Sequence, residues 1–174
     1  MDSIKIVREI IFSHGRLSIV RDTWRESDGN KKEYTYLKKA GGVVILPVYD
    51  NGDMLFINQY RYLVGQKCLE LPAGGIENGE SPLAAAKREL FEETGYRTDE
   101  LHEMTVFYPS NGISSEKVYA FLCNITTDSG PLKEPEDGID LHRLKKVEVI
   151  KLLASGEIKG ASSFIALSCY MMNI

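Results

Sequence analysis

Cysteine is scarce in this sequence. Its 174 residues include three, which are odd in number and widely spaced: Cys68, Cys123 and Cys169. Such a set argues against a disulfide-stapled secreted fold, and no pair has the spacing of metal ligands. We therefore expect three reduced thiols in a cytoplasmic protein.

Long apolar runs are absent as well. No stretch approaches the roughly 18 apolar residues of a membrane span. The first 13 residues carry four charged side chains among the apolar ones, so they lack the uninterrupted core of a signal peptide. The sequence therefore predicts no membrane association.

An excess of positive charge is also missing. Lysine and arginine number 21 against 25 acidic residues, which gives a net charge of −4 and a pI near 5.5. Because a nucleic-acid-binding domain needs a basic face, no nucleic-acid partner is expected. The composition, 43% hydrophobic and 26% charged, is typical of one globular domain.

The hydrophobic pattern that is present favours strands in several places. Residues 16–25 and 33–38 have strand-like side chains, and the intervening Ser-Asp-Gly-Asn at 27–30 predicts a turn, hence a hairpin. Further strands are expected at 42–48, 54–60, 103–108 and 118–125. Two C-terminal helices are expected at 144–154 and 161–172. This order favours an α/β class fold in which a mixed sheet packs between helices, an α/β/α sandwich.

One more helix is predicted between these strands. Ser81 is a good N-cap residue, Pro82 suits the first helical position, and Gly95 is placed to end the helix. Leu83, Ala86 and Leu90 would form the apolar stripe that docks it.

Three carboxylates share one face of this helix. Glu89, Glu92 and Glu93 stand at i, i+3 and i+4, so their side chains are neighbours and their charges repel. A hard divalent cation with oxygen ligands would relieve that repulsion, and Mg²⁺ suits a few carboxylates plus phosphate and water. The alternative is a solvated acidic face in which Arg88 and Glu92 form an ordinary i,i+4 pair.

The residues around the carboxylates decide between these readings. The segment 74–96 resembles the Nudix box, Gly-x5-Glu-x7-Arg-Glu-aliphatic-x-Glu-Glu-x-Gly-aliphatic. Every fixed position is met, by Gly74, Glu80, Arg88, Glu89, Leu90, Glu92, Glu93 and Gly95. Tyr96 is the one departure, where the family usually has an aliphatic residue, and it concerns packing.

The resemblance implies a Nudix-type α/β/α sandwich that hydrolyses a nucleoside diphosphate linked to another group. It implies Mg²⁺, with Mn²⁺ able to substitute, held by Glu89, Glu92, Glu93 and the backbone carbonyl of Ala73. Glu80 and Arg88 would support the loop and orient the carboxylates. Together with Glu93, these two residues are the predicted catalytic residues of the box.

The flanks resemble the ADP-ribose pyrophosphatase branch of that family from about residue 35 to 166. The landmarks are Gln-Tyr-Arg at 59–61, Glu-Leu-Pro-Ala-Gly-Gly at 70–75 and a proline after the box at 109. The resemblance implies a small nucleotide-sugar substrate, with Arg61 on a phosphate and Glu70 on ribose hydroxyls. Glu116, in the loop 109–117, would be the base or an extra metal ligand. For Arg61, Glu70 and Glu116 alike, the alternative is an ordinary surface charge or ion-pair member with no part in catalysis.

The N-terminal hairpin carries exposed-type aromatics. Trp24, Tyr34 and Tyr36 would stack on a base, or else serve hairpin packing or a dimer contact. Proteins of this branch typically form homodimers through such hairpins, so a homodimer is expected. We predict a hairpin extension over residues 1–38 and a Nudix hydrolase domain over 39–174.

Two other functions remain open at this point. A hydrolase of GDP-mannose or UDP-sugars shares the same landmarks. A ligand-sensing, non-catalytic Nudix domain is the alternative of a different class, but a sensor has no need for an electrostatically costly carboxylate cluster.

Overall fold

The computed structural model describes residues 6–126 and 131–172, so the outermost residues of the two predicted domains, 1–5 and 173–174, lie outside it. The chain forms two compact units. The first contains the chain up to Gly41 together with Tyr108–Lys117, and the second contains Gly42–Phe107 and the chain from Val118 onward. Each unit is described by itself below.

The elements follow one another in this order: β1 (Val7–His14), β2 (Leu17–Arg25), β3 (Lys31–Lys39), β4 (Gly42–Tyr49), β5 (Met54–Arg61), β6 (Gln66–Glu70), β7 (Ala73–Gly75), α1 (Pro82–Thr94), β8 (Leu101–Phe107), β9 (Val118–Ile125), β10 (Ile139–Leu144), α2 (Lys146–Ser155) and α3 (Ala161–Met171).

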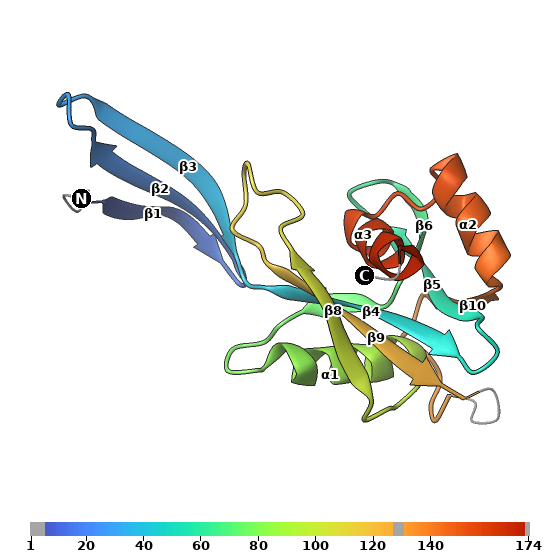
Figure 1. Ribbon diagram of the computed structural model, residues 1–174. Helices are drawn as coiled ribbons and strands as arrows, with labels where there is room; N and C mark the ends of the chain where they lie inside the picture. The colour runs from blue at the N-terminus through green and yellow to red at the C-terminus, as the bar shows by residue number, and fades with distance from the viewer. Residues whose placement is uncertain (1–5, 127–130, 173–174) are drawn as a thin grey trace. The chain divides into compact units, whose positions relative to one another are not determined.

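The first unit is built on an antiparallel sheet in which the described strands run in the order β1-β2-β3 (Figure 1). The predicted hairpin is confirmed as β2 and β3, with the turn closed by a hydrogen bond from the Gly29 N–H to the Glu26 carbonyl at 2.9 Å. β1 was not expected. Its register shifts at a bulge between Ile10 and Phe12, which breaks the period of two that identifies a strand in sequence.

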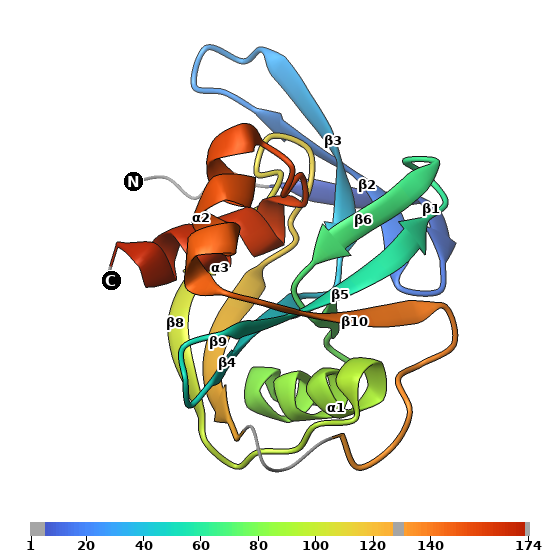
Figure 2. The same ribbon diagram turned by 90° about the vertical axis from the view of Figure 1, so that its right-hand side faces the viewer.

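The second unit is a mixed sheet covered by helices on both faces. Its described strands run β10-β5-β4-β9-β8, with β6 beside β5 and β7 beside β4, and only the β4–β9 pair is parallel. Figure 2 shows α1 on one face and α2 and α3 on the other. The α/β/α sandwich expected from the sequence is therefore confirmed.

The buried strand β4 explains this layering. All eight of its residues are buried. Val43 and Ile45 pack on the side of α1, whereas Val44 and Leu46 pack on the side of α2 and α3. Side chains that alternate between two apolar layers produce the continuous apolar run in the sequence.

Helix α1 begins and ends as its sequence indicates. The Ser81 hydroxyl accepts a hydrogen bond from the Ala84 N–H at 3.2 Å, and Gly95, at φ 75°, donates its N–H to the Phe91 carbonyl at 2.9 Å. The docking stripe differs from the expectation at one position. Leu83 is 42% exposed and Ala85 is buried in its place, beside Ala86 and Leu90.

Tyr96, the departure from the box, is a packing residue. It is 9% exposed, its ring meets the Tyr49 ring edge-on with centroids 6.2 Å apart, and the two hydroxyls are 3.2 Å apart.

Among the described residues, none of the helices has the length and apolar character that a membrane span requires.

Candidate active site

Arg88 ties the loop before α1 to the carboxylates on the helix. Its guanidinium donates to both carboxylate oxygens of Glu80, at 3.1 and 3.0 Å, and to the Gly75 carbonyl at 2.9 Å. It also donates to Glu89 Oε1 at 2.7 Å and to Glu92 Oε2 at 2.9 Å. The five N–H groups of the guanidinium are thus matched by five hydrogen bonds. One side chain fixes the loop and two carboxylates together.

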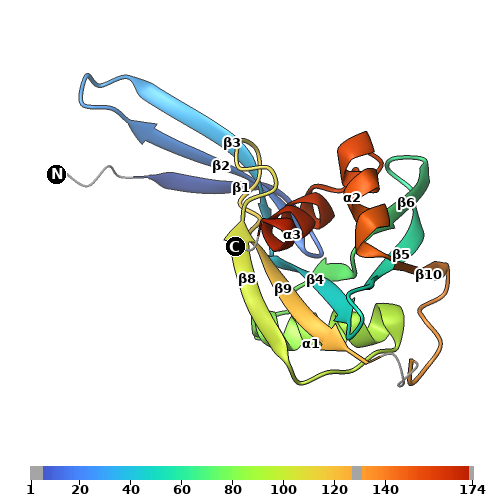
Figure 3. The ribbon, with the colours of Figure 1, turned by 45° about the vertical axis from the view of Figure 1, so that its right-hand side comes forward.

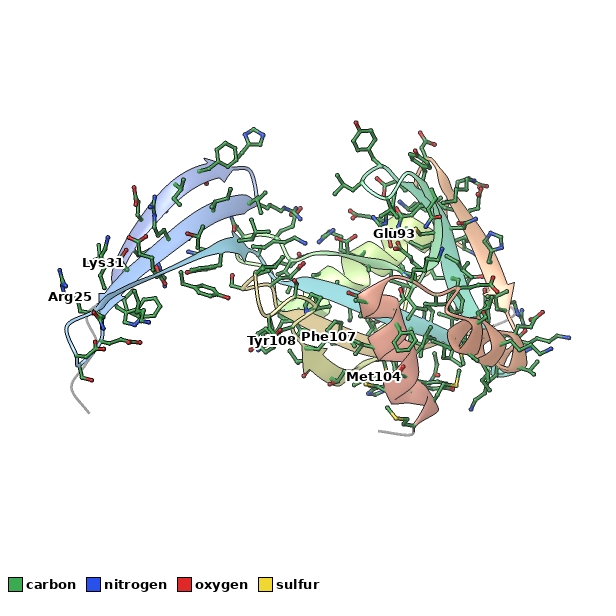
Figure 4. The ribbon with its side chains drawn as sticks, turned by 90° about the horizontal axis from the view of Figure 1, so that it is seen from above. Arg25, Lys31, Glu93, Met104, Phe107 and Tyr108 are labelled. Atoms are coloured by element: carbon green, nitrogen blue, oxygen red, sulfur yellow. The ribbon has the colours of Figure 1, made fainter. Side chains whose placement is uncertain are left out.

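Glu93 stands apart from this network. Its residue is 7% exposed, and Oε2 accepts a hydrogen bond from the Ala73 N–H at 2.8 Å (Glu93 is labelled in Figure 4). Burial disfavours the charged carboxylate and raises the pKa of Glu93 to about 8. The Ala73 N–H and the Arg61 charge oppose that rise, while the Glu89 charge adds to it.

Glu89 is also held in a confined place. Its side chain is 12% exposed, and burial raises its pKa, against the opposing effect of Arg88. A Cβ at Gly74 would overlap the Glu89 carboxylate, so the backbone of β7 lies directly against that group. This close approach gives a physical reason for glycine at the first position of the box.

The donor set suits a divalent cation, but the side chains are not already gathered around one. Across residues 6–126 and 131–172, no three histidine, cysteine or acidic side chains converge in a metal-binding group. Glu89 and Glu92 turn one oxygen each toward Arg88, and Glu93 turns one toward Ala73. The second oxygen of each accepts no hydrogen bond from the described residues, which leaves three hard oxygen donors on one helix for an ion.

Arg61 and Glu70, predicted to contact substrate, are paired with each other. Arg61 ends β5 and Glu70 ends β6, two antiparallel neighbours visible in Figure 3. Arg61 Nε and Nη2 lie 2.8 and 2.6 Å from Glu70 Oε2. The Arg61 side chain remains 41% exposed, and its charge acts on Glu93. The Arg61 charge is therefore close enough to Glu93 to favour the charged form of that carboxylate.

Sequence reasoning missed one acidic residue. Glu136 precedes β10 and is exposed, and its charge adds a small contribution to the raised pKa of Glu93, which is caused mainly by burial. It is 43 positions from Glu93 in the chain, so no helical or strand spacing connects the two. Only the fold brings this second source of carboxylate near the helix.

The remaining predicted site residues belong to the first unit. Glu116 Oε1 accepts from Lys39 Nζ at 2.6 Å, and the loop that carries it pairs with β3 through hydrogen bonds between Leu37 and residues 113 and 115. Glu116 is therefore held in an ion pair with a residue of β3, and its role in catalysis stays a prediction.

The three aromatic residues share one face of the β1-β2-β3 sheet. Trp24 lies opposite Lys32 in register, and Tyr34 and Tyr36 lie opposite Asp22 and Val20, so all three side chains project to the same side. The two tyrosine rings have centroids 6.4 Å apart. Tyr34 donates its hydroxyl hydrogen bond to the Gly112 carbonyl, while the Tyr36 hydroxyl is 3.5 Å from Asp22.

The family model of the NUDIX domain matches residues 38–163, and the chain belongs to the Nudix hydrolase family. Members of this family generally use divalent metal ions.

Two relatives of known name align with nearly the whole chain. The chain is 31% identical over 165 residues to an ADP-ribose pyrophosphatase of Bacillus subtilis, covering 93% of this chain and 89% of that protein. It is 27% identical over 181 residues to a GDP-mannose pyrophosphatase of Yersinia enterocolitica, covering 95% and 94%. A crystal structure of an ADP compounds hydrolase shares the fold, with a TM-score of 0.77 and 20% identity over 99% of this chain and 94% of that one.

Proposed function

We propose that this protein is a Mg²⁺-dependent hydrolase of the diphosphate bond in a nucleoside diphosphate linked to a sugar, converting ADP-ribose to AMP and ribose 5-phosphate. The observation that carries the proposal is the complete box assembled on α1 and its preceding loop. Glu80 and Arg88 hold the loop, and Glu89, Glu92 and Glu93 each retain an oxygen for an ion.

Glu89, Glu92 and Glu93 would hold the metal, joined by the Ala73 carbonyl. Divalent ions bound there would neutralise the diphosphate and supply an activated water at neutral pH. The protein's own part is to fix the donors: Arg88 orients two carboxylates, and the Ala73 N–H orients the third. Mn²⁺ has the same preference for oxygen donors and is expected to substitute.

Arg61 is the side chain best suited to meet a substrate phosphate in the second unit. Both of its bonds to Glu70 end on one carboxylate oxygen, which leaves further N–H groups of the guanidinium for a ligand, and the Arg61 side chain is 41% exposed. Glu70, at 13% exposure, is held by Arg61 and lies against Gly160, whose added Cβ would sit 3.2 Å from Glu70 Oε1. Glu70 would thus accept from ribose hydroxyls only through its remaining exposed edge.

Two carboxylates are candidates for the base that orients the water. Glu116 is proposed from the family pattern, and it is held by Lys39. Glu136 is the second candidate, as an exposed carboxylate whose charge makes a small contribution to the raised pKa of Glu93. A separate proposal concerns the nucleobase of the substrate. It would stack on the aromatic residues that share one sheet face, Trp24, Tyr34 and Tyr36.

A hydrolase of GDP-mannose or another nucleoside-diphosphate sugar is the second candidate. The relative of that activity aligns over almost its full length, and the carboxylate and arginine groups above would serve either substrate.

The test is a substrate panel of ADP-ribose, GDP-mannose and UDP-glucose with Mg²⁺, read out as released nucleoside monophosphate. ADP-ribose is expected to give the highest kcat/KM, with sugar phosphate released in equal amount. Release of inorganic phosphate alone, or turnover of none of the three, would overturn the proposal.

We also propose a cytoplasmic homodimer. All eight residues of β1 are exposed, and they include Ile10, Ile11 and Phe12 at 62, 46 and 53%. An apolar edge strand of this kind favours association. The three cysteines are all unpaired, as expected in a reducing compartment. Light scattering on the purified protein would report the dimer mass, and a monomer at micromolar concentration would contradict it.

A further inference from the structure

The face of α1 that turns away from the sheet borders a cavity that shares one residue, Arg88, with the proposed active site. Its volume is about 450 Å³, within the range of small-molecule sites. All of its lining residues belong to the second unit: Lys87, Arg88, Phe91, Arg97, Thr98 and Asp99. Three of these side chains are cationic and one is anionic.

The turn at the end of α1 creates this cavity. Gly95 adopts φ 75°, a left-handed conformation that reverses the chain after the helix. Arg97 therefore returns over the last turns of the helix, with its guanidinium carbon 3.9 Å from the centroid of the Phe91 ring. Stacking on an aromatic ring restrains an arginine while its N–H groups stay directed outward.

A second cation approaches the same ring from elsewhere in the chain. The Leu132 N–H donates to the Gly95 carbonyl at 2.9 Å, which brings the next residue alongside. Lys133 Nζ lies 4.9 Å from the Phe91 centroid. Two positive charges are thus gathered at one aromatic side chain, and in the described part of the chain no carboxylate forms an ion pair with Arg97 or Lys133.

The other charged residues of the wall are already engaged. Arg88 directs its N–H groups to Glu80, Glu89, Glu92 and Gly75, so it adds no free donor. Lys87 Nζ is 2.8 Å from the carboxylate of Asp99, whose side chain is fully exposed. An exposed ion pair of this type is weak, so Lys87 can exchange Asp99 for another anion.

From this arrangement we propose that the cavity binds a small molecule through a phosphate group, at a site separate from the glutamate cluster. Arg97 supplies a planar fork that matches two phosphate oxygens, and Lys87 supplies a point charge on the cavity wall. Lys133 does not line the cavity, but beside the Phe91 ring it adds positive charge nearby. The Thr98 hydroxyl is a further donor on the wall. Asp99 is the competing anion that the phosphate displaces from Lys87.

The test is calorimetric titration of inorganic phosphate into the chelated, metal-free protein at low ionic strength. Arg97→Ala should weaken phosphate binding about tenfold or more, because it removes charge-assisted hydrogen bonds. Arg97→Lys should give an intermediate loss. Asp99→Asn should tighten binding about threefold, because Lys87 loses its internal partner. Lys159→Ala, an exposed cation on another surface, is the matched control and should change nothing.

Binding at the active site is distinguished by Arg61→Ala. If that substitution abolishes the signal while Arg97→Ala leaves the dissociation constant within twofold, the site is not the cavity. Unchanged affinity in both Arg97→Ala and Asp99→Asn would overturn the proposal in the same way. Neither result bears on hydrolysis, which is measured separately with metal present.

Discussion

Replacing Glu93 with glutamine should raise stability and lower activity at the same time. Glutamine keeps the shape of the side chain and its carbonyl oxygen can still accept from the Ala73 N–H, now 2.8 Å from Glu93. What it removes is a charge that burial disfavours, because the residue is 7% exposed and burial raises its pKa to about 8. The negative charge on Glu93 lowers the stability of the metal-free fold, and the same charge is expected to bind the metal ion.

The size of the stability effect follows from linkage. Each pKa unit corresponds to about 1.4 kcal/mol, so a rise to about 8 corresponds to about 5 kcal/mol at most. Because Glu93 keeps a hydrogen bond from the Ala73 N–H and the favourable charge of Arg61, we expect the free energy of unfolding to rise by roughly 2–4 kcal/mol, which at this chain length is roughly 5–15 °C in Tm.

The effect has a defined pH window. The folded-state pKa of Glu93 lies above the unfolded value near 4.5, so between these pH values the folded state retains a proton that the unfolded state has lost. The contribution of Glu93 to wild-type stability therefore falls as pH rises from about 4.5 to about 8 and is level above that. The Glu93→Gln variant lacks this loss, and its advantage is greatest above pH 8.

Thermal unfolding in EDTA at pH 5, 6.5 and 8.5 measures the effect. Glu92→Gln is the matched control, because Glu92 is 46% exposed and bonded to Arg88, and its replacement should not stabilise. With Mg²⁺ present, Glu93→Gln should lower kcat about 10²–10⁴-fold. A variant that is no more stable than wild type at pH 8.5 in EDTA would refute the reasoning.

Three further predictions concern single residues. Gly74→Ala should displace the Glu89 carboxylate and weaken Mn²⁺ binding, measured by electron paramagnetic resonance, about tenfold or more; an unchanged affinity would remove Glu89 from the metal site. Glu116→Gln and Glu136→Gln should differ in kcat. Replacing whichever glutamate is the catalytic base should lower kcat about 10²-fold and leave KM within a few-fold of wild type. Near-wild-type kinetics for both would return the base to the helix. Burial raises the pKa of the Cys123 thiol to about 12, so a thiol reagent at pH 8 should modify at most two of the three cysteines until guanidinium unfolds the chain; rapid modification of all three in the native protein would contradict the burial.

The helix of the site could be predicted almost completely from the sequence. Its cap, its end and the spacing of its carboxylates are local features, and the structure has them where the sequence indicates. The central strand β4 was equally predictable because burial on both faces leaves an unbroken apolar run. Leu83 was misplaced because the first turn of α1 is less covered than a regular stripe implies.

The parts that escaped prediction depend on contacts between distant segments. β6, β7 and β10 were not expected: β7 has three residues, and β6 and β10 mix polar and apolar residues without a clean alternation. The bond between Arg61 and Glu70 requires the register of β5 against β6, which the sequence does not state. The approach of Glu136 to Glu93 depends in the same way on where the segment before β10 runs.

The most direct test of the central claim is one reaction in ¹⁸O-labelled water. Exhaustively chelated protein is mixed with ADP-ribose, Mg²⁺ is then restored, and the masses of the products are measured by mass spectrometry. We predict no turnover before the metal, then AMP and ribose 5-phosphate in equal amounts, with one ¹⁸O in one of the two phosphates. Full turnover in the chelated sample, or label in released inorganic phosphate alone, would contradict the account.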